Sequence, residues 1–267
     1  MPGLGLGNML TGVAALSEFT PASISNLDLW YDFSTVTGSN GDAQASFANA
    51  GGGGSNYDLA QSTAGSRPTL DTSELALNSL DFDSDRFDLA NAYLTTDQTF
   101  SIFIVYEVDA TGDVDTFIAG SSAGANQFGV YNQKNVTTRF NADVTGSLNS
   151  VEYIRTDQTT QDAGYGGSAT TTTAYTLTAD PEILVLTRAA DEEIKIYNKA
   201  GALIGLSTST TNNHANTNFE IDHIGLQSGG AAETNGVIGE IGVYNKTLSA
   251  GEVSSLITHL AAKWSIS

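Results

Sequence analysis

The chain of 267 residues carries 30 Asp and Glu against 10 Lys and Arg, so its formal net charge is −20. That charge repels nucleic-acid phosphate and anionic membrane surfaces, and neither is expected as a partner. There is no cysteine, which excludes disulfides and thiol chemistry, and no stretch approaches the roughly 20 apolar residues of a membrane-spanning helix. The 28 glycines and 4 prolines fit many short strands joined by turns, as in one large β-sandwich.

Residues 1–20 are predicted to form a Gly-rich anchoring arm ahead of a single domain over residues 21–267. A small apolar arm can lie in a groove of a partner protein. The side chains expected to anchor it are Leu4, Leu6, Met9, Leu10, Val13 and Leu16. No Lys or Arg precedes this apolar stretch and glycines interrupt it, so a secretory signal is not expected.

The first predicted strand covers residues 24–33. Alternation puts Leu27, Leu29, Tyr31 and Phe33 on one face and leaves Trp30 on the other, partly exposed. Residues 35–54 follow and end in four consecutive glycines. We expect a long connection there, with a flexible contact loop as the alternative.

Three carboxylates stand at alternate positions at Asp81, Asp83 and Asp85. Oxygen ligands of this kind suit Ca²⁺, although the spacing of an EF-hand is not met. The favoured interpretation is the outward side of a strand whose inward side is Leu80 and Phe82. No cofactor is therefore predicted, and Ca²⁺ bound by these three residues is the alternative.

The strongest strand pattern is the apolar run of residues 99–108, which predicts a central strand buried on both faces. Shorter strands are expected at residues 116–119, 127–131, 137–140, 182–188, 193–198, 202–207 and 221–227. A turn at residues 198–201 predicts a hairpin. The Thr-rich residues 164–178 are expected to be an edge strand or an exposed loop.

Near the C-terminus, Val237, Ile241 and Val243 alternate with glycine and polar residues, which predicts a half-buried strand ending in a turn at residues 244–246. A helix is predicted next. Ser249 is placed to cap it, and Glu252 can reach back to the Ser249 amide in a capping box.

The predicted helix is amphipathic. Its apolar side chains recur at helical spacing and are Val253, Leu256, Ile257, Leu260 and Trp264. We therefore expect the helix to dock on the sandwich through this stripe, with Trp264 packed between them.

The segments GEIGVYNKTLS and GEVSSLITHLAAKW at residues 239–264 resemble the end of concanavalin A-like (LamG-like) jelly-roll domains. Residues 21–33 are similar to the opening strand of that family, and residues 67–70 and 80–85 to its early segments. The resemblance covers about residues 20–266. It implies an all-β, concanavalin A-like jelly-roll β-sandwich with one short C-terminal helix.

The same family includes glucan-cleaving enzymes with three acids on one strand, spaced as Glu-x-Asp-x-(x)-Glu. Glu220 and Asp222 come nearest, but Ile224 and Gly225 occupy the positions where the third acid would fall. No catalytic residue is predicted, and the two acids are expected on a solvated strand face. The three histidines, His214, His223 and His259, are expected to be structural.

Carbohydrate binding in this fold class uses exposed aromatic side chains together with Asp and Asn hydrogen bonds. The candidates are Trp30, Tyr57, Tyr153, Tyr165 and Tyr175.

A Gly-rich arm followed by one jelly roll also resembles virion structural proteins of tailed phages, particularly marine ones. That resemblance implies a non-enzymatic capsid decoration, knob or tail-fibre component on the virion. Its implied partners are phage capsid or tail proteins and host glycans, in a homo-oligomer such as a trimer. A lectin and a degenerate glycoside hydrolase are the alternatives.

Overall fold

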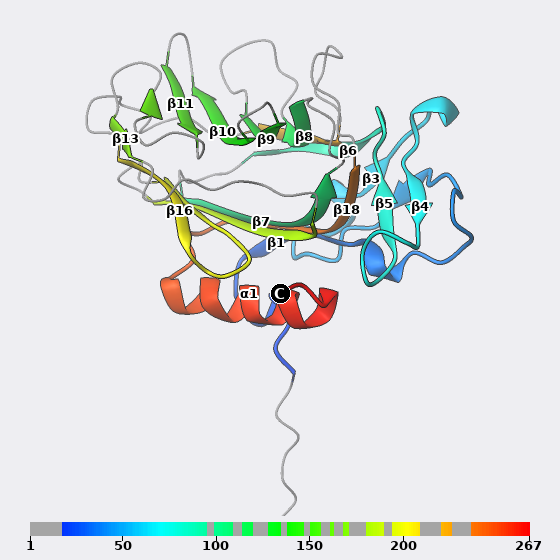
Figure 1. Ribbon diagram of the computed structural model, residues 1–267. Helices are drawn as coiled ribbons and strands as arrows, with labels where there is room; N and C mark the ends of the chain where they lie inside the picture. Colours follow the sequence, from blue (N-terminus) through cyan, green and yellow to red (C-terminus); the bar gives the residue numbers. More distant parts are fainter. Residues whose placement is uncertain are drawn as a thin grey trace, which may run out of the picture.

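The computed structural model describes residues 18–94, 99–108, 114–119, 128–134, 138–146, 150–155, 161–162, 168–170, 180–189, 194–208, 220–225 and 236–267. Within these ranges two antiparallel β-sheets lie face to face, and one α-helix covers the outer face of one sheet (Figure 1). The all-β sandwich with a C-terminal helix that the sequence predicts is confirmed. Across the same ranges, no helix is long and apolar enough to cross a membrane.

The sheet beneath the helix has ten strands in the described chain, and all its pairs are antiparallel. Its order is β12 (Gln161–Asp162), β13 (Ser168–Thr170), β16 (Leu203–Thr208), β15 (Ile194–Tyr197), β14 (Glu182–Arg188), β7 (Phe100–Val108), β18 (Gly236–Tyr244), β5 (Ser79–Asp81) and β4 (Thr69–Asp71), with β1 (Leu27–Asp32) also paired to β18. Short 3-10 helices flank these strands at η1 (Pro21–Ser23), η2 (Phe33–Thr35), η3 (Gly54–Tyr57) and η4 (Ala64–Ser66).

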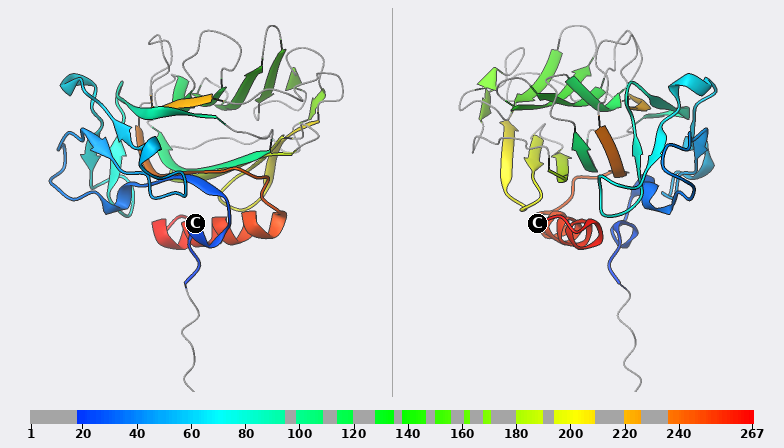
Figure 2. Two further views of the ribbon diagram at one scale, coloured as in Figure 1. Left: turned by 180° about the vertical axis from the view of Figure 1, so that it is seen from behind. Right: turned by 45° about the vertical axis from the view of Figure 1, so that its right-hand side comes forward.

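The second sheet has eight strands among the described residues. Its order is β11 (Ser150–Arg155), β10 (Thr138–Gly146), β9 (Phe128–Lys134), β8 (Val114–Ala119), β17 (Glu220–Gly225), β6 (Arg86–Leu94), β3 (Leu59–Ala60) and β2 (Ser46–Phe47). Figure 2 shows the two sheets as separate layers, with the helix on the far side of the ten-stranded sheet.

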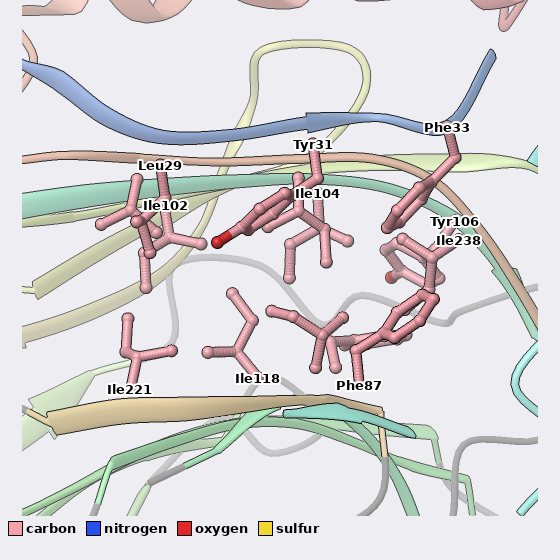
Figure 3. Close-up of a cluster of buried hydrophobic side chains, with 14 of the residues drawn as sticks. Leu29, Tyr31, Phe33, Phe87, Ile102, Ile104, Tyr106, Ile118, Ile221 and Ile238 are labelled. Carbon is pink, nitrogen blue, oxygen red and sulfur yellow. The ribbon is translucent and has the colours of Figure 1, made fainter. Parts of the chain in front are cut away.

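The main core fills the space between the sheets. Figure 3 shows Leu29 and Tyr31 of β1, and Phe33 directly after it, pointing toward the eight-stranded sheet, which contributes Ile118 and Ile221. All five side chains are buried. The alternation predicted for the first strand is therefore confirmed from Leu29 onward. The prediction for Leu27 is wrong: it packs in the core beneath the helix, because the register of β1 against β18 shifts between Leu27 and Leu29.

The prediction of a central strand is also confirmed. Strand β7 pairs with β14 on one side and with β18 on the other, and its apolar residues are buried. The hairpin predicted at residues 198–201 joins β15 to β16, and the Gly201 N–H donates to the Asn198 carbonyl at 2.8 Å. Most of the Thr-rich segment lies outside the described residues, apart from β13 near the end of the ten-stranded sheet.

The prediction that the last strand is half-buried is wrong. All nine residues of β18 are buried, because the helix covers the outer face of the sheet at this strand. Val237 lies under the helix, whereas Ile241 and Val243 face the other sheet, since the register against β7 shifts between Ile238 and Glu240.

Tyr244 belongs to β18 rather than to the turn after it. Its hydroxyl donates to the Pro21 carbonyl at 2.9 Å.

The helix α1 (Ala250–Trp264) has the predicted cap and the predicted packing face. Ser249 accepts from the Glu252 amide and the Glu252 carboxylate accepts from the Ser249 amide, so two N–H groups are satisfied at the first turn. The residues of the predicted stripe, Val253, Leu256, Ile257, Leu260 and Trp264, are all buried. They form a second core between the helix and the sheet.

The four consecutive glycines close the free edge of β1. The N–H groups of Gly52 and Gly53 donate to the carbonyls of Leu27 and Asp28 at 2.7 and 3.0 Å. A Cβ at Gly51 would stand 2.3 Å from the Asp28 oxygen, so a residue without a side chain is needed there. The segment is the predicted connection, and it packs against β1 instead of forming a contact loop.

Gly242 offers a test of how tightly the second core is packed. A Cβ at this position would stand 2.1 Å from Cε1 of the buried Phe103, so Gly242→Ala is expected to lower the free energy of unfolding by about 1–3 kcal/mol. In Gly251→Ala, the new Cβ meets nothing within 4 Å on an exposed helical site, and a gain of about 0.5–1 kcal/mol is expected. Urea unfolding of both variants checks these opposite signs, and equal stabilities would contradict them.

Candidate functional site

A pocket of about 400 Å³ opens where residues 18–20, strand β1 and helix α1 meet. It is lined by Glu18, Thr20, Trp30, Asp32, His259, Ala262 and Lys263. Figure 1 shows this part of the molecule on the helix side, away from the eight-stranded sheet.

Strand alternation brings Trp30 and Asp32 into this pocket. Leu29 and Tyr31 are fully buried toward the main core, so Trp30 and Asp32, which alternate with them, face the helix and stay partly exposed. The helix contributes His259, from its partly exposed flank, to the facing wall.

A buried carboxylate fixes the indole of Trp30. Glu240 of β18 is 0% exposed, and its Oε1 accepts from the Trp30 Nε1–H at 2.7 Å. Its Oε2 accepts from the Trp264 Nε1–H at 3.0 Å and from the Lys263 ammonium at 2.7 Å. Donors from β1 and α1 thus meet on one carboxylate, which offsets the cost of burying its charge.

Lys263 extends this network to the pocket wall. Its ammonium lies 2.7 Å from Oδ1 of Asp32, and the same oxygen accepts from the Ser34 amide and hydroxyl. Two of the three N–H donors of Lys263 can be accounted for by Glu240 and Asp32, so one donor remains. Lys263, Asp32 and Glu240 therefore hold one another in place.

Tyr244 lies in the same layer beneath the helix. Burial raises its pKa well above the usual range, and the negative charges of Glu240 and Glu252 raise it further. The phenol therefore stays protonated and remains a donor to the Pro21 carbonyl.

A second pocket of about 400 Å³ adjoins the first along α1. Its lining is Glu18, Phe19, Ser254, Ser255, Thr258, His259 and Ala262, so three residues belong to both pockets. The Phe19 and His259 rings stand edge to face, with their centroids 5.7 Å apart. This contact holds residues 18–20 against the helix.

Among the residues predicted to bind carbohydrate, Trp30 lies in a pocket and Tyr57 does not line it. Tyr57 packs edge to face on Tyr93, with ring centroids 5.3 Å apart, and is half-buried against the main core. Tyr165, Tyr175 and the side chain of Tyr153 lie outside the described residues.

In the acidic segment from Leu80 to Asp85, the apolar side chains point inward and the carboxylates of Asp81 and Asp83 outward, as the sequence predicts. Leu80 and Phe82 are fully buried, while Asp81 and Asp83 are partly or fully exposed. Burial and the charges of Asp81 and Asp83 raise the pKa of Asp85 to about 6. In the described ranges, no group of three or more His, Cys, Asp or Glu side chains is arranged to hold a metal ion. Ca²⁺ binding by Asp81, Asp83 and Asp85 stays an untested prediction.

A polar cluster lies on the outer face of the eight-stranded sheet. His223 of β17 stands opposite Asp88 of β6, and its Nδ1 lies 2.9 Å from Oδ1 of Asp88, which also pairs with Arg86 at 3.0 Å. Asp222, expected to be solvated, is only 14% exposed in its side chain and lies beside His223. The sequence did not indicate this because the β6–β17 register shifts between Ile221 and His223.

The anchoring residues of the arm, from Leu4 to Leu16, lie outside the described residues. The partners that the structure gives Trp30 were not predicted, and no local pattern pointed to them. Glu240 reaches Trp30 through the pairing of β18 with β1, and the docking of α1 then brings residue 263 next to residues 32 and 240.

Comparison with known proteins finds similarity in fold. No protein-family model matches the chain, and no curated protein matches it in sequence. Among solved structures, the binding domain of Paraclostridial Mosquitocidal Protein 1 superposes with a TM-score of 0.57 at 9% identity, covering 88% of this chain and 52% of that one.

The binding domain of botulinum neurotoxin DC is also similar, in complex with rat synaptotagmin II (TM-score 0.56) and in complex with SialylT (TM-score 0.55). Identity is 10% in both, with the same shares of 88% and 52% covered. The chain thus spans about half the length of these structures. At such identities the likeness shows the fold alone, a β-sandwich of the kind found in binding domains.

The hydrogen bonds that Trp30, Trp264 and Lys263 donate to Glu240, here called the Glu240 network, can be tested by comparing Lys263 with Lys246. Lys263→Met removes the cation that faces a fully buried carboxylate, and a loss of about 3 kcal/mol in unfolding free energy is expected. Lys246 pairs with the partly exposed Glu252, so Lys246→Met is expected to cost less than about 1 kcal/mol. Chemical denaturation measures both, and equal losses would show that Glu240 does not depend on Lys263.

The raised pKa of Asp85 predicts that the stability of the fold depends on pH. Its folded-state pKa of about 6 exceeds the ordinary 3.8, so the folded protein binds the proton more tightly and loses stability as pH rises through that window. Asp85→Asn should therefore be more stable than the parent at about pH 7, with the gain vanishing near pH 4. Urea midpoints across this range give the difference, and a gain independent of pH would contradict it. If the three aspartates bind Ca²⁺, the ion should stabilise the parent more than the variant.

Proposed function

We propose that the protein is a non-enzymatic, lectin-like binding module that serves as a virion structural protein of a tailed phage, of the capsid decoration or tail-fibre type. The observation that carries this proposal is that residues 18–20, at the root of the N-terminal arm, and the eight-stranded sheet lie on opposite sides of the sandwich. Glu18 and Phe19, where the N-terminal arm joins the domain, line a pocket with residues of α1. The helix lies on the outer face of the ten-stranded sheet, and the eight-stranded sheet is on the opposite side (Figures 1 and 2). A module tethered by its arm would present that outer face to solvent or host.

We also propose that the sandwich is of the concanavalin A-like, LamG-like kind. The sequence segments that resemble this family form β1, β4, β5 and the β18–α1 unit. Strands β4, β5, β18 and β1 are joined by direct pairing in the ten-stranded sheet, which supports the assignment.

A firm junction supports the role of residues 1–20 as an anchor. Next to the arm, Phe19 contacts His259 and the Pro21 carbonyl accepts from buried Tyr244. A pull on the arm would therefore be transmitted to α1 and β18. The proposed partners are phage capsid or tail proteins, in a homo-oligomer such as a trimer.

The proposal that the protein is not an enzyme is supported by the contacts of Asp222, one of the two acids nearest to the glycosidase pattern. Asp222 lies against His223, which also pairs with Asp88, so these groups are engaged with one another. The strand lacks the third acid that a retaining glycosidase needs. The similar solved structures described above are binding domains, which agrees with this view.

A lectin, on a phage or a bacterium, is the second candidate. It is favoured by the pocket between residues 18–20, β1 and α1, here called the Trp30 pocket. Ligand sites combine apolar or aromatic side chains with a few polar groups that orient the ligand, and this pocket offers Trp30 together with Asp32 and Lys263. A glycan array that stays blank with and without Ca²⁺ would contradict this candidate.

Deletion of residues 1–20 tests the virion role. We expect the full chain to rebind, saturably and in fixed stoichiometry, to virions or capsids stripped of accessory proteins. The deleted chain should lose the contacts of Phe19 with His259 and of Thr20 with Ser23, yet remain folded by circular dichroism, because the buried residues of both cores begin at Ile24. It should fail to rebind. Light scattering of the mixtures gives the stoichiometry, and undiminished rebinding of the deleted chain would refute the anchor.

A further inference from the structure

We propose that the pocket between residues 18–20, β1 and α1 binds one ring of a neutral saccharide. This inference rests on the proposed binding function and assigns its ligand a place and a chemical class. It sets the binding site beside the root of the arm, not on the outer face of the eight-stranded sheet.

Trp30 supplies a preorganised stacking surface. The ring is half-buried and lines the pocket, while its Nε1–H is engaged by Glu240 at 2.7 Å. Since Glu240 also holds Trp264 and Lys263, the indole plane is fixed before any ligand arrives. A ligand that stacks on the ring therefore does not bear the cost of ordering it.

The polar lining requires a ligand whose groups both donate and accept. Glu18 and Asp32 offer acceptors, and Lys263 retains one N–H donor beyond those that Glu240 and Asp32 use. A hydroxyl group can meet either kind of partner. A ring that carries several hydroxyls and an apolar face fits these groups and the indole together.

Charged ligands fit less well. An acidic sugar would bring its carboxylate against Glu18 and Asp32, and the only ammonium lining the pocket is already paired with two carboxylates. A cationic ammonium group carries no acceptor, so it would leave the remaining N–H donor of Lys263 without a partner. A volume of about 400 Å³ lies at the lower end of the range for small-molecule sites and suits a small ligand.

Ala262 and Ser255 allow a matched test on one helix. Both side chains are exposed, but Ala262 lines the Trp30 pocket and Ser255 lines only the adjoining one. Ala262→Gln adds a side chain to the Trp30 pocket and replaces none of the residues that bond to Glu240. Ser255→Gln adds the same side chain outside the Trp30 pocket. Both replacements suit an exposed helical site, and denaturation midpoints confirm that the variants are folded.

The probes are the methyl glycosides of galactose, glucose, mannose and N-acetylglucosamine, with sialyllactose and tetramethylammonium chloride as the acidic and cationic alternatives. Calorimetric titration of the full chain should show binding of at least one neutral glycoside and weaker or no binding of the charged probes. Ala262→Gln should weaken that binding roughly tenfold or more, and Ser255→Gln should leave it within about twofold.

Tryptophan fluorescence gives an independent readout. The chain has two tryptophans, and Trp264 is 1% exposed, so acrylamide quenching reports mainly on Trp30. A bound neutral glycoside should reduce quenching of the parent protein, and this protection should be lost in Ala262→Gln.

The outcomes separate the two proposals. Neutral glycoside binding that Ala262→Gln leaves unchanged would overturn the pocket assignment and keep a lectin-like function elsewhere on the sandwich. Preference for sialyllactose or tetramethylammonium would overturn the ligand class. Absence of binding to every glycoside, together with a blank glycan array, would overturn both the pocket assignment and the glycan-binding part of the proposed function.

Discussion

The position of α1 on the sandwich depends on the buried carboxylate of Glu240. A fully buried charge is strongly unfavourable unless donors surround it, and here the donors are the indoles of Trp30 and Trp264 and the ammonium of Lys263. These donors come from the first strand and the last helix. Apolar packing alone would allow the helix to slide, whereas the two hydrogen bonds from Lys263 and Trp264 to one carboxylate fix both its rotation and its position along the sheet.

Several other features follow from this docking. The helix covers β18, so that strand can be buried on both faces, and Gly242 gives room to the Phe103 ring in the second core. Tyr244 lies beneath the helix and holds the carbonyl of Pro21, which brings the root of the N-terminal arm alongside. The pocket that contains Trp30 is therefore formed by the same contacts between residues 18–20, β1 and α1. The proposed anchoring arm and the proposed ligand site would lie side by side.

The elements with a clear periodicity could be predicted from the sequence. Alternation in residues 29–33 and the stripe from Val253 to Trp264 each indicated which side chains are buried, because one local period decides the face. Alternation failed for Leu27, which lies before a register shift in β1. The face of Val237 could not be predicted, since a register shift after Ile238 reverses the alternation. The environment of Glu240 was also not predictable: a glutamate between glycine and isoleucine resembles any solvated strand residue until the helix is placed over it. Trp30 is partly exposed, as predicted, but the partner of its indole N–H was not predictable because Glu240 lies 210 residues away in the chain.

Hydrogen exchange at the two indole N–H groups tests the central role of Glu240 most directly. Proton–nitrogen NMR spectra should show one signal for each of the two tryptophans, assigned with Trp30→Phe. If both indoles donate to a buried carboxylate, both should exchange as slowly as the amides of β7 and β18 and lose protection together with them. Rapid exchange of the Trp30 indole, while the amides of β18 stay protected, would contradict the account.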